Sequence, residues 1–292
     1  MLGTALLADL QSHGGVGLQL VRRAPTQENE LEWNPDAARP LTNADALEGL
    51  AAVVHLGGAN VAARRWDAEY RRKMTSSRIQ STHALATVLA GLRQPPPVLL
   101  VASATGIYGD RGDEVLTEES PAGSGFLAEL CQLWEDSAAP AVRAGIRVVH
   151  LRFGVVLGPG AGALGKMLPL FRMGLGGRLG SGRQWSSWIS LDDVVAAVRF
   201  LLEKPAAAGP YNLVAPNPVT NAEFTRALAA AVHRPAIFHA PAFALRLAVG
   251  QMADEALLAS TRVLPARLQH AGFGFQHPTV AEALCRVVPA GA

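Results

Sequence analysis

Short, continuous apolar runs alternate with amphipathic stretches along most of the chain. Such runs, rich in valine and leucine, predict parallel strands that are covered on both faces, and they occur at Val16–Val21, Val53–Leu56, Val98–Ala102, Arg147–Leu151 and Tyr211–Val214. The amphipathic stretches predict helices, and they lie at Asp67–Leu92, Leu127–Ala144, Asp192–Leu202 and Ala222–Val232. Because strands and helices alternate, we expect right-handed crossovers and a doubly wound parallel sheet of the α/β class.

The pattern changes from about Pro235 onward. Pro241–Val249 and Ala253–Val263 predict helices, and no convincing buried strand follows them. We therefore expect a large domain over residues 1–234 and a small, mainly helical C-terminal module over residues 235–292.

The beginning of the chain departs from what a dinucleotide-binding sheet requires. Such a sheet opens with a strand and a glycine-rich turn into a helix, whose N–H groups bind the pyrophosphate. Here Met1–Leu10 already predicts a helix, and Gly14–Gly17 predicts a helix-to-strand turn. Gly3 then matches the last glycine of a fingerprint whose strand is missing. We expect either a true start upstream of Met1 or a form that cannot hold the pyrophosphate normally.

Composition narrows the classes of function. Hydrophobic residues make up 49% and charged residues 17%, which excludes a disordered chain. The net charge is +2 and the basic residues are scattered, so we expect no nucleic-acid partner and no anionic membrane surface. Two cysteines without a CxxC pair predict neither a disulfide framework nor a metal site. With no apolar membrane span and no secretory signal, we expect a cytoplasmic protein.

Arg22 and Arg23 follow the first predicted strand. An acidic residue at this strand end would bind the ribose of NAD, whereas arginine can pair with the extra phosphate of NADP. The position favours NADP(H) over NAD(H), and the alternative is a solvated basic turn.

Motifs in a fixed order carry a family resemblance. Together they resemble the extended short-chain dehydrogenase/reductases, and most closely the atypical branch of NAD(P)-dependent epimerase-family proteins with a small C-terminal domain of unassigned function. The resemblance covers Gly3 to about Val288 and implies a Rossmann-like sheet with a truncated first strand. The motifs are His55–Asn60, Ser103–Asp110, Leu151–Gly158, Gly174–Gly177, Gly180–Trp185, Ser187–Val194, Tyr211–Pro216 and Gly272–Phe275.

The resemblance assigns residues at two strand ends. It places Leu56, Gly57 and Gly58 along the dinucleotide, where a side chain would block the cofactor; the alternative is a simple strand-end turn. It also places Ala102 and Ser103 at the cofactor. There the Ser103 hydroxyl would polarise a substrate carbonyl or hydroxyl, since open α/β sheets bind ligands at this edge.

Further residues are expected to line a substrate pocket built from segments 160–192 and 205–220. Asn60 adjoins the glycine pair, and Thr105 follows Ser103 either as a second hydroxyl or as a strand-end cap. Tyr108 either contributes to catalysis and lines the pocket or only packs its ring. Lys166 could meet an anionic group, although a solvated lysine is the alternative.

The remaining predictions concern the later motifs. Trp185 and Trp188 lie where a substrate lid would sit, with core burial as the alternative for one of them. We expect Arg152 to form a structural salt bridge. At least one of Asp192 and Asp193 is expected to be a helix N-cap.

Two departures put catalysis in question. The superfamily uses a Tyr-x-x-x-Lys pair that moves the proton during hydride transfer, and here Leu127 and Cys131 stand in its place. Cys131 would be a nucleophile only beside a base or cation. Val155 replaces an asparagine that contacts the diphosphate in nucleotide-sugar enzymes, so a nucleotide sugar is not supported.

Two hypotheses follow from the sequence. The first is an NADP(H)-binding enzyme, similar to epimerases and oxidoreductases, that acts on an unknown small molecule. The second is a catalytically silent NADP(H)-binding sensor or regulatory protein. By resemblance we also expect a homodimer through the helices Asp67–Leu92 and Leu127–Ala144.

Overall fold

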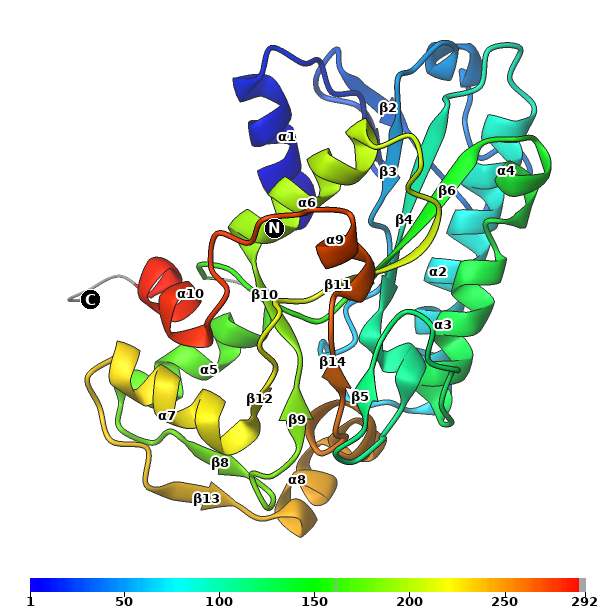
Figure 1. The fold of residues 1–292 in the computed structure, drawn as a ribbon. Coiled ribbons are helices and arrows are strands. Elements are labelled where there is room, and N and C mark those ends of the chain that lie inside the picture. The colour runs from blue at the N-terminus through cyan, green and yellow to red at the C-terminus, as the bar shows by residue number, and fades with distance from the viewer. Residues whose placement is uncertain (161, 289–292) are drawn as a thin grey trace.

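A four-stranded parallel sheet forms the centre of the computed structural model, which describes residues 1–160 and 162–288 (Figure 1). The strand order is β11-β6-β4-β3, and the register runs from Val98 opposite Arg147 to Ala104 opposite Phe153. This confirms the expected parallel α/β sheet. The strands are β3 (Val53–His55), β4 (Val98–Ala104), β6 (Arg147–Phe153) and β11 (Gly209–Leu213).

A second parallel pair, β1 (Gln19–Val21) and β2 (Glu30–Glu32), is hydrogen-bonded to no other strand among the described residues. In the generic doubly wound order 3-2-1-4-5-6, strand 1 lies between strands 2 and 4. In this structure β1 takes the place of generic strand 2, and β3 takes the place of generic strand 4. The sheet is therefore in two pieces. The strand that was predicted from Val16 begins only at Gln19. Val16 precedes it and is 92% exposed.

Helices cover both faces of the sheet (Figure 1). On one face, α2 (Ala68–Ala90), α3 (Phe126–Asp136) and α4 (Ala139–Arg143) pack against Leu99 and Val101 of β4. On the other face, residues of α1 (Leu2–Ser12), α6 (Leu191–Glu203) and α9 (Ala266–His270) pack against Leu100. This alternation follows from the strand, whose successive side chains point to opposite faces.

One predicted helix, Leu127–Ala144, is two helices in the structure. The first ends at Asp136, and Pro140 lies in the first turn of the second. Proline lacks an N–H and is tolerated in the first helical turn but not in a helix interior. The chain therefore breaks between α3 and α4.

The rest of the chain packs beside the sheet. The helices α5 (Gly162–Arg172), α7 (Asn221–Ala231) and α10 (Val280–Val287) share a core around the fully buried Trp188. Four two-stranded ladders connect the segments: β10 (Trp188–Ser190) with β7 (Val155–Leu157), β12 (Val219–Thr220) with β9 (Trp185–Ser186), β13 (Phe238–Ala240) with β8 (Gly177–Leu179), and β14 (Arg262–Val263) with β5 (Val115–Leu116).

The C-terminal module departs from its prediction in two ways. The helix expected over Ala253–Val263 ends at Leu257, because η3 (Ala253–Leu257) is a single π-helical turn that follows α8 (Ala242–Val249). The strands β13 and β14 were not predicted, and each pairs with a strand of residues 1–234. Two- and three-residue strands have no periodicity that a sequence pattern could reveal.

Ser190, and neither aspartate, is the N-cap of α6, so the prediction for Asp192 and Asp193 was wrong. The Ser190 hydroxyl accepts the N–H of Asp193 at 3.0 Å. Asp193 is fully buried and accepts the N–H groups of Gln276 and His277 at 2.7 and 3.1 Å. Its carboxylate thus fixes the C-terminal module to α6. Among the described residues, no helix combines the length and apolar character that crossing a membrane requires.

Candidate functional site

The turn after β3 presents bare backbone at the carboxyl edge of the sheet. Gly57 and Gly58 are exposed, and helix α2 holds the turn from behind. The N–H of Ala59 donates to the Ser77 hydroxyl at 2.9 Å, and Arg78 Nη2 donates to the Ala59 carbonyl at 3.0 Å. A side chain at Gly57 would approach the His55 ring to 2.8 Å, which explains the glycine.

His55 packs beneath this turn. Its Nε2 atom shares a hydrogen bond of 3.2 Å with the Ser81 hydroxyl on α2. Burial lowers the pKa of His55 to about 4. The imidazole is therefore neutral at neutral pH and acts as a support of the glycine turn, with no charge of its own.

Ser103, at the end of β4, is engaged by a buried ion pair. Its hydroxyl donates to Glu135 Oε1 at 2.7 Å. Arg152 donates to both carboxylate oxygens of Glu135, from Nε at 2.8 Å and from Nη2 at 2.9 Å. Burial opposes the ionisation of Glu135, but the hydrogen bonds from Arg152 and Ser103 outweigh it, and the pKa of Glu135 is lowered. This confirms the structural salt bridge expected of Arg152.

Tyr108 continues the same buried chain of polar groups. Its ring is fully buried, its hydroxyl donates to Asn212 Oδ1 at 2.8 Å, and Arg152 Nη1 donates to the hydroxyl at 3.0 Å. Burial raises the pKa of Tyr108. The hydroxyls of Ser103 and Tyr108 thus both contact protein groups, and a catalytic role for either stays a prediction.

Helix α3 carries no proton-transfer pair at the place where the family resemblance expects one. Leu127 and Cys131 lie beside Gly106, whose added Cβ would meet Leu127 Cβ at 3.3 Å and Cys131 Sγ at 4.0 Å. Burial raises the pKa of Cys131 to about 12, so the residue is a neutral thiol. Cys131 therefore behaves as a small buried hydrophobe, not as a nucleophile.

Arg78 supplies a buried cation that the sequence did not point to. The guanidinium stacks over the Trp134 ring, with the Cζ atom 4.9 Å from the ring centre, and the residue is 8% exposed. Its hydrogen bonds go to the carbonyls of Met74 and Ala59, and no carboxylate of the described residues pairs with it. Burial is the main cause that lowers the pKa of Arg78. An arginine inside a long amphipathic helix gave no signal of this role.

A cavity of about 220 Å³ opens next to the Thr105–Tyr108 turn. Thr105 itself is buried, 9% exposed, at the start of that turn. The cavity brings together the first turn of α3 and the C-terminal module. Its lining residues are Gly106, Gly109, Asp110, Ser124, Leu127, Ala128, Asp254 and Glu255.

Arg22 and Arg23 differ in how firmly the protein holds them. Arg23 donates to both carboxylate oxygens of the buried Glu30, at 2.8 and 2.6 Å, and this hydrogen bonding lowers the pKa of Glu30 to about 2. Arg22 pairs with Asp36 at 2.9 Å, and both side chains are more than half exposed. Arg22 is therefore the freer of the two. Gly3 lies in the first turn of α1, with no atom within 4 Å of an added Cβ.

The structure does not bring these four predicted pocket residues together. Lys166 donates from Nζ to the Ala62 carbonyl, and Asn60 Oδ1 accepts the Ala62 N–H at 2.9 Å, so both contact one loop. Trp188 is fully buried, and its indole donates to the Asn217 carbonyl at 3.1 Å, which matches the core alternative. Trp185 lies apart and donates to Asp113 at 2.8 Å.

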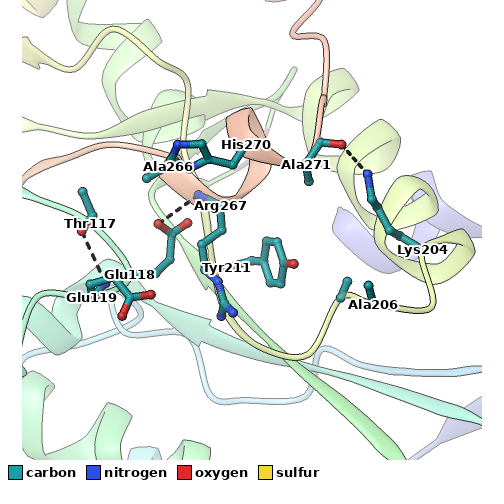
Figure 2. A pocket seen from close by; sticks show the side chains of 11 residues that line it. Thr117, Glu118, Glu119, Lys204, Ala206, Tyr211, Ala266, Arg267, His270 and Ala271 are labelled. Atoms are coloured by element: carbon teal, nitrogen blue, oxygen red, sulfur yellow. Dashed lines mark hydrogen bonds between the residues drawn. The ribbon is translucent and has the colours of Figure 1, made fainter.

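A larger hollow of about 620 Å³ lies at the outer edge of β11 (Figure 2), and it contains none of the predicted site residues. Arg267 Nη1 donates to the Pro210 carbonyl at 2.9 Å, and the Asn212 N–H donates to Glu118 Oε1 at 2.9 Å. Pro210 has no N–H to offer. These side chains satisfy the edge of the strand and block pairing with another strand. We therefore interpret the side chains around the hollow as groups that protect the edge of β11.

Comparison with known proteins finds two family matches along the chain. Residues 1–214 match the NAD dependent epimerase/dehydratase family. Residues 240–287 match a domain of unknown function that is defined as a family of its own.

Several relatives cover most of the chain. An epimerase family protein of Mycobacterium bovis is 46% identical over 97% of this chain and 93% of its own length. One from Staphylococcus aureus is 40% identical over 80% of this chain and 77% of its own. The crystal structure of the human epimerase family protein SDR39U1 (isoform 2) with NADPH superposes with a TM-score of 0.91. It is 31% identical and covers 99% of this chain and 96% of its own.

Proposed function

Because the chain belongs to the NAD-dependent epimerase/dehydratase family, we propose that it binds NADP(H) and acts as an oxidoreductase or epimerase on a small molecule. One observation carries the proposal. The exposed backbone of Gly57 and Gly58 follows β3 beside the Ser103 end of β4, at the edge where doubly wound sheets bind nucleotides. Leu56 and Ala102 adjoin these ends and would contact the same ligand.

The residues present fit a dinucleotide at this edge. The glycine pair has no side chain that would stand between backbone and ligand, and Ser77 and Arg78 fix the turn from behind. When bound, the nicotinamide supplies a hydride acceptor or donor. The protein's part is to bind and orient the ligand.

Arg22 supports NADP(H) over NAD(H). Its guanidinium lies at the end of β1, and its one side-chain partner among the described residues is the exposed Asp36, so a phosphate can replace that partner. Arg23 already forms an ion pair with the buried Glu30. The human relative that was crystallised with NADPH is consistent with this preference.

A catalytically silent NADP(H)-binding protein is the second candidate. The observation that favours it is the engagement of the Ser103 and Tyr108 hydroxyls by Glu135 and Asn212, in a chain without the Tyr-Lys pair. In that case ligand binding would be the function, and no substrate would turn over.

Two measurements test the proposal on the full chain. Titration with NADPH and NADH, followed by nicotinamide fluorescence, should show saturable binding with a preference for NADPH. Lack of NADPH binding, or a preference for NADH, contradicts the cofactor half. A panel of small alcohols with NADP+ and of aldehydes and ketones with NADPH then separates the two candidates. Turnover supports the enzyme, and binding without any turnover supports the silent protein.

A further inference from the structure

The first turn of α3 is capped by a residue of the C-terminal module. The N-cap position is Gly125, which has no side chain to accept a hydrogen bond and has a φ of +104°. Glu255 Oε2 accepts the N–H of Leu127 at 2.7 Å instead. Gln251 Nε2 donates to the other oxygen, Oε1, at 2.5 Å.

The same carboxylate lines the 220 Å³ cavity together with Gly106 and Leu127. Leu127 is the residue that stands where related enzymes carry the tyrosine. Glu255 therefore brings a proton-binding group next to the position that lacks one.

The charged side chains near Glu255 interact with groups other than its carboxylate. Asp254 pairs with Arg246 at 2.8 Å. Asp110 Oδ1 accepts the N–H groups of Gly112 and Ser260 at 3.2 and 3.1 Å. Arg71 of α2 donates to Gln251 at 3.2 Å and to no carboxylate. Among the described residues, no lysine, arginine or histidine forms an ion pair with Glu255.

The backbone at both ends of this contact is unusual. Glu255 lies in the π-helical turn Ala253–Leu257, and such turns occur often at functional sites. A Cβ at Gly125 would lie 3.3 Å from Glu255 Oε2, so a side chain there would crowd the carboxylate. A serine or aspartate at the N-cap could satisfy the helix end without help from a second domain. The contact does more than capping requires, because it also places a carboxylate at the cavity.

We propose that Glu255 is the acid–base residue of this cavity. As a base, its carboxylate takes the proton of a substrate hydroxyl: the substrate O–H bond breaks, an O–H bond to Glu255 forms, and the electron pair stays on the substrate oxygen. As an acid, it returns the proton by the reverse step. The inference rests on the proposed function, and it assigns the C-terminal module a part in the same site.

The cavity wall also indicates the class of substrate. Asp110, Asp254 and Glu255 line this small space, Arg246 offsets the charge of Asp254 alone among the three, and carboxylates repel an anionic ligand. We therefore infer a small alcohol or carbonyl compound that is neutral or cationic.

Chemical labelling of carboxylates tests the placement without requiring turnover. The full chain is treated with a water-soluble carbodiimide and glycine ethyl ester, with and without NADPH, and labelled sites are found by mass spectrometry. At an NADPH concentration about ten times the Kd, labelling of Glu255 should fall about tenfold, because the uncharged nicotinamide end of the bound nucleotide would cover the carboxylate and only the unbound fraction still reacts. Glu282 is the matched control, since it also caps a helix of the C-terminal module and borders no described cavity. Equal labelling of Glu255 with and without NADPH overturns the inference.

The variant Glu255→Gln tests the chemistry. The amide oxygen can still accept the Leu127 N–H, but it cannot take a proton. We expect an unchanged Kd for NADPH, a nearly unchanged KM and a kcat that is about 10²- to 10⁴-fold lower on the substrate that the panel identifies. Glu282→Gln should keep the parent kcat. A Glu255→Gln protein with the parent kcat overturns the inference and leaves the proposed function standing, whereas failure of the parent protein to bind NADPH overturns both.

Discussion

Arg152 and Glu135 face each other in the buried interior with two parallel hydrogen bonds, at 2.8 and 2.9 Å. The pair joins the end of β6 to α3, and it also holds the Ser103 hydroxyl. A buried ion pair is weak support for stability by itself, but removal of one partner leaves an uncompensated charge.

Glu135→Ala should therefore destabilise the protein by about 3–5 kcal/mol, because Arg152 would stay buried without its partner. Asp36→Ala breaks the exposed pair with Arg22 and should cost less than about 1 kcal/mol. Urea denaturation of both variants measures the two free energies of unfolding. If Glu135→Ala lowers the free energy of unfolding no more than Asp36→Ala does, the fold does not depend on the Glu135 carboxylate.

Arg78→Met should weaken NADPH binding by about tenfold, since a hydrogen bond from a charged group is worth about 1.5–3 kcal/mol and this one fixes the glycine turn. Methionine keeps much of the packing against Trp134 but removes the donor to the Ala59 carbonyl. Fluorescence titration gives the Kd. Arg72→Met, on an exposed position of the same helix, is the control and should bind as the parent does. Equal affinity of the two variants would exclude Arg78 from the binding site.

Replacement by alanine should affect different properties at Arg22 and at Arg23. Arg22→Ala should lower the affinity for NADPH and leave that for NADH unchanged, because only NADPH carries the extra phosphate. Arg23→Ala should lower the thermal midpoint, because the buried Glu30 loses its guanidinium partner. Calorimetric titration with both nucleotides and a thermal melt of each variant check the assignment. If Arg23→Ala is the variant that loses NADPH specificity, the assignment of the phosphate to Arg22 is wrong.

His55 should make the protein less stable in mild acid. Its pKa is about 4 in the folded protein and about 6.5 in an unfolded chain. Between these two pH values His55 is therefore mostly protonated in the unfolded state and mostly neutral in the folded state. Stability is thus full above about pH 6.5 and falls by up to about 3 kcal/mol as the pH drops toward 4. His55→Gln, which can still bond to Ser81, should flatten this dependence in urea denaturation at several pH values. The exposed His13→Gln should leave it unchanged, and an unaltered slope in His55→Gln would assign the acid sensitivity to other groups.

The amino-acid sequence was enough to predict the parallel sheet and the residues at its carboxyl edge, where doubly wound sheets generally bind ligands. Strand β4 opens on the apolar run Val98–Ala102, and β6 has Val148, Val149 and Leu151 among its buried positions, a composition that burial in a parallel sheet requires. The Gly57–Gly58 turn and Ser103 follow such runs directly, so their place at the carboxyl edge was predictable. The absence of the Tyr-Lys pair at Leu127 and Cys131 was also readable without coordinates.

Which polar groups meet became visible with the packing of the elements. Glu255 reaches Leu127, and Arg78 reaches Ala59, across long stretches of chain. The same is true of the two tryptophans, because the full burial of Trp188 and the partial burial of Trp185 depend on the strands that pair beside them. Local periodicity reports which face of an element is apolar, whereas a contact between distant segments depends on how the elements pack, which no short window of sequence contains.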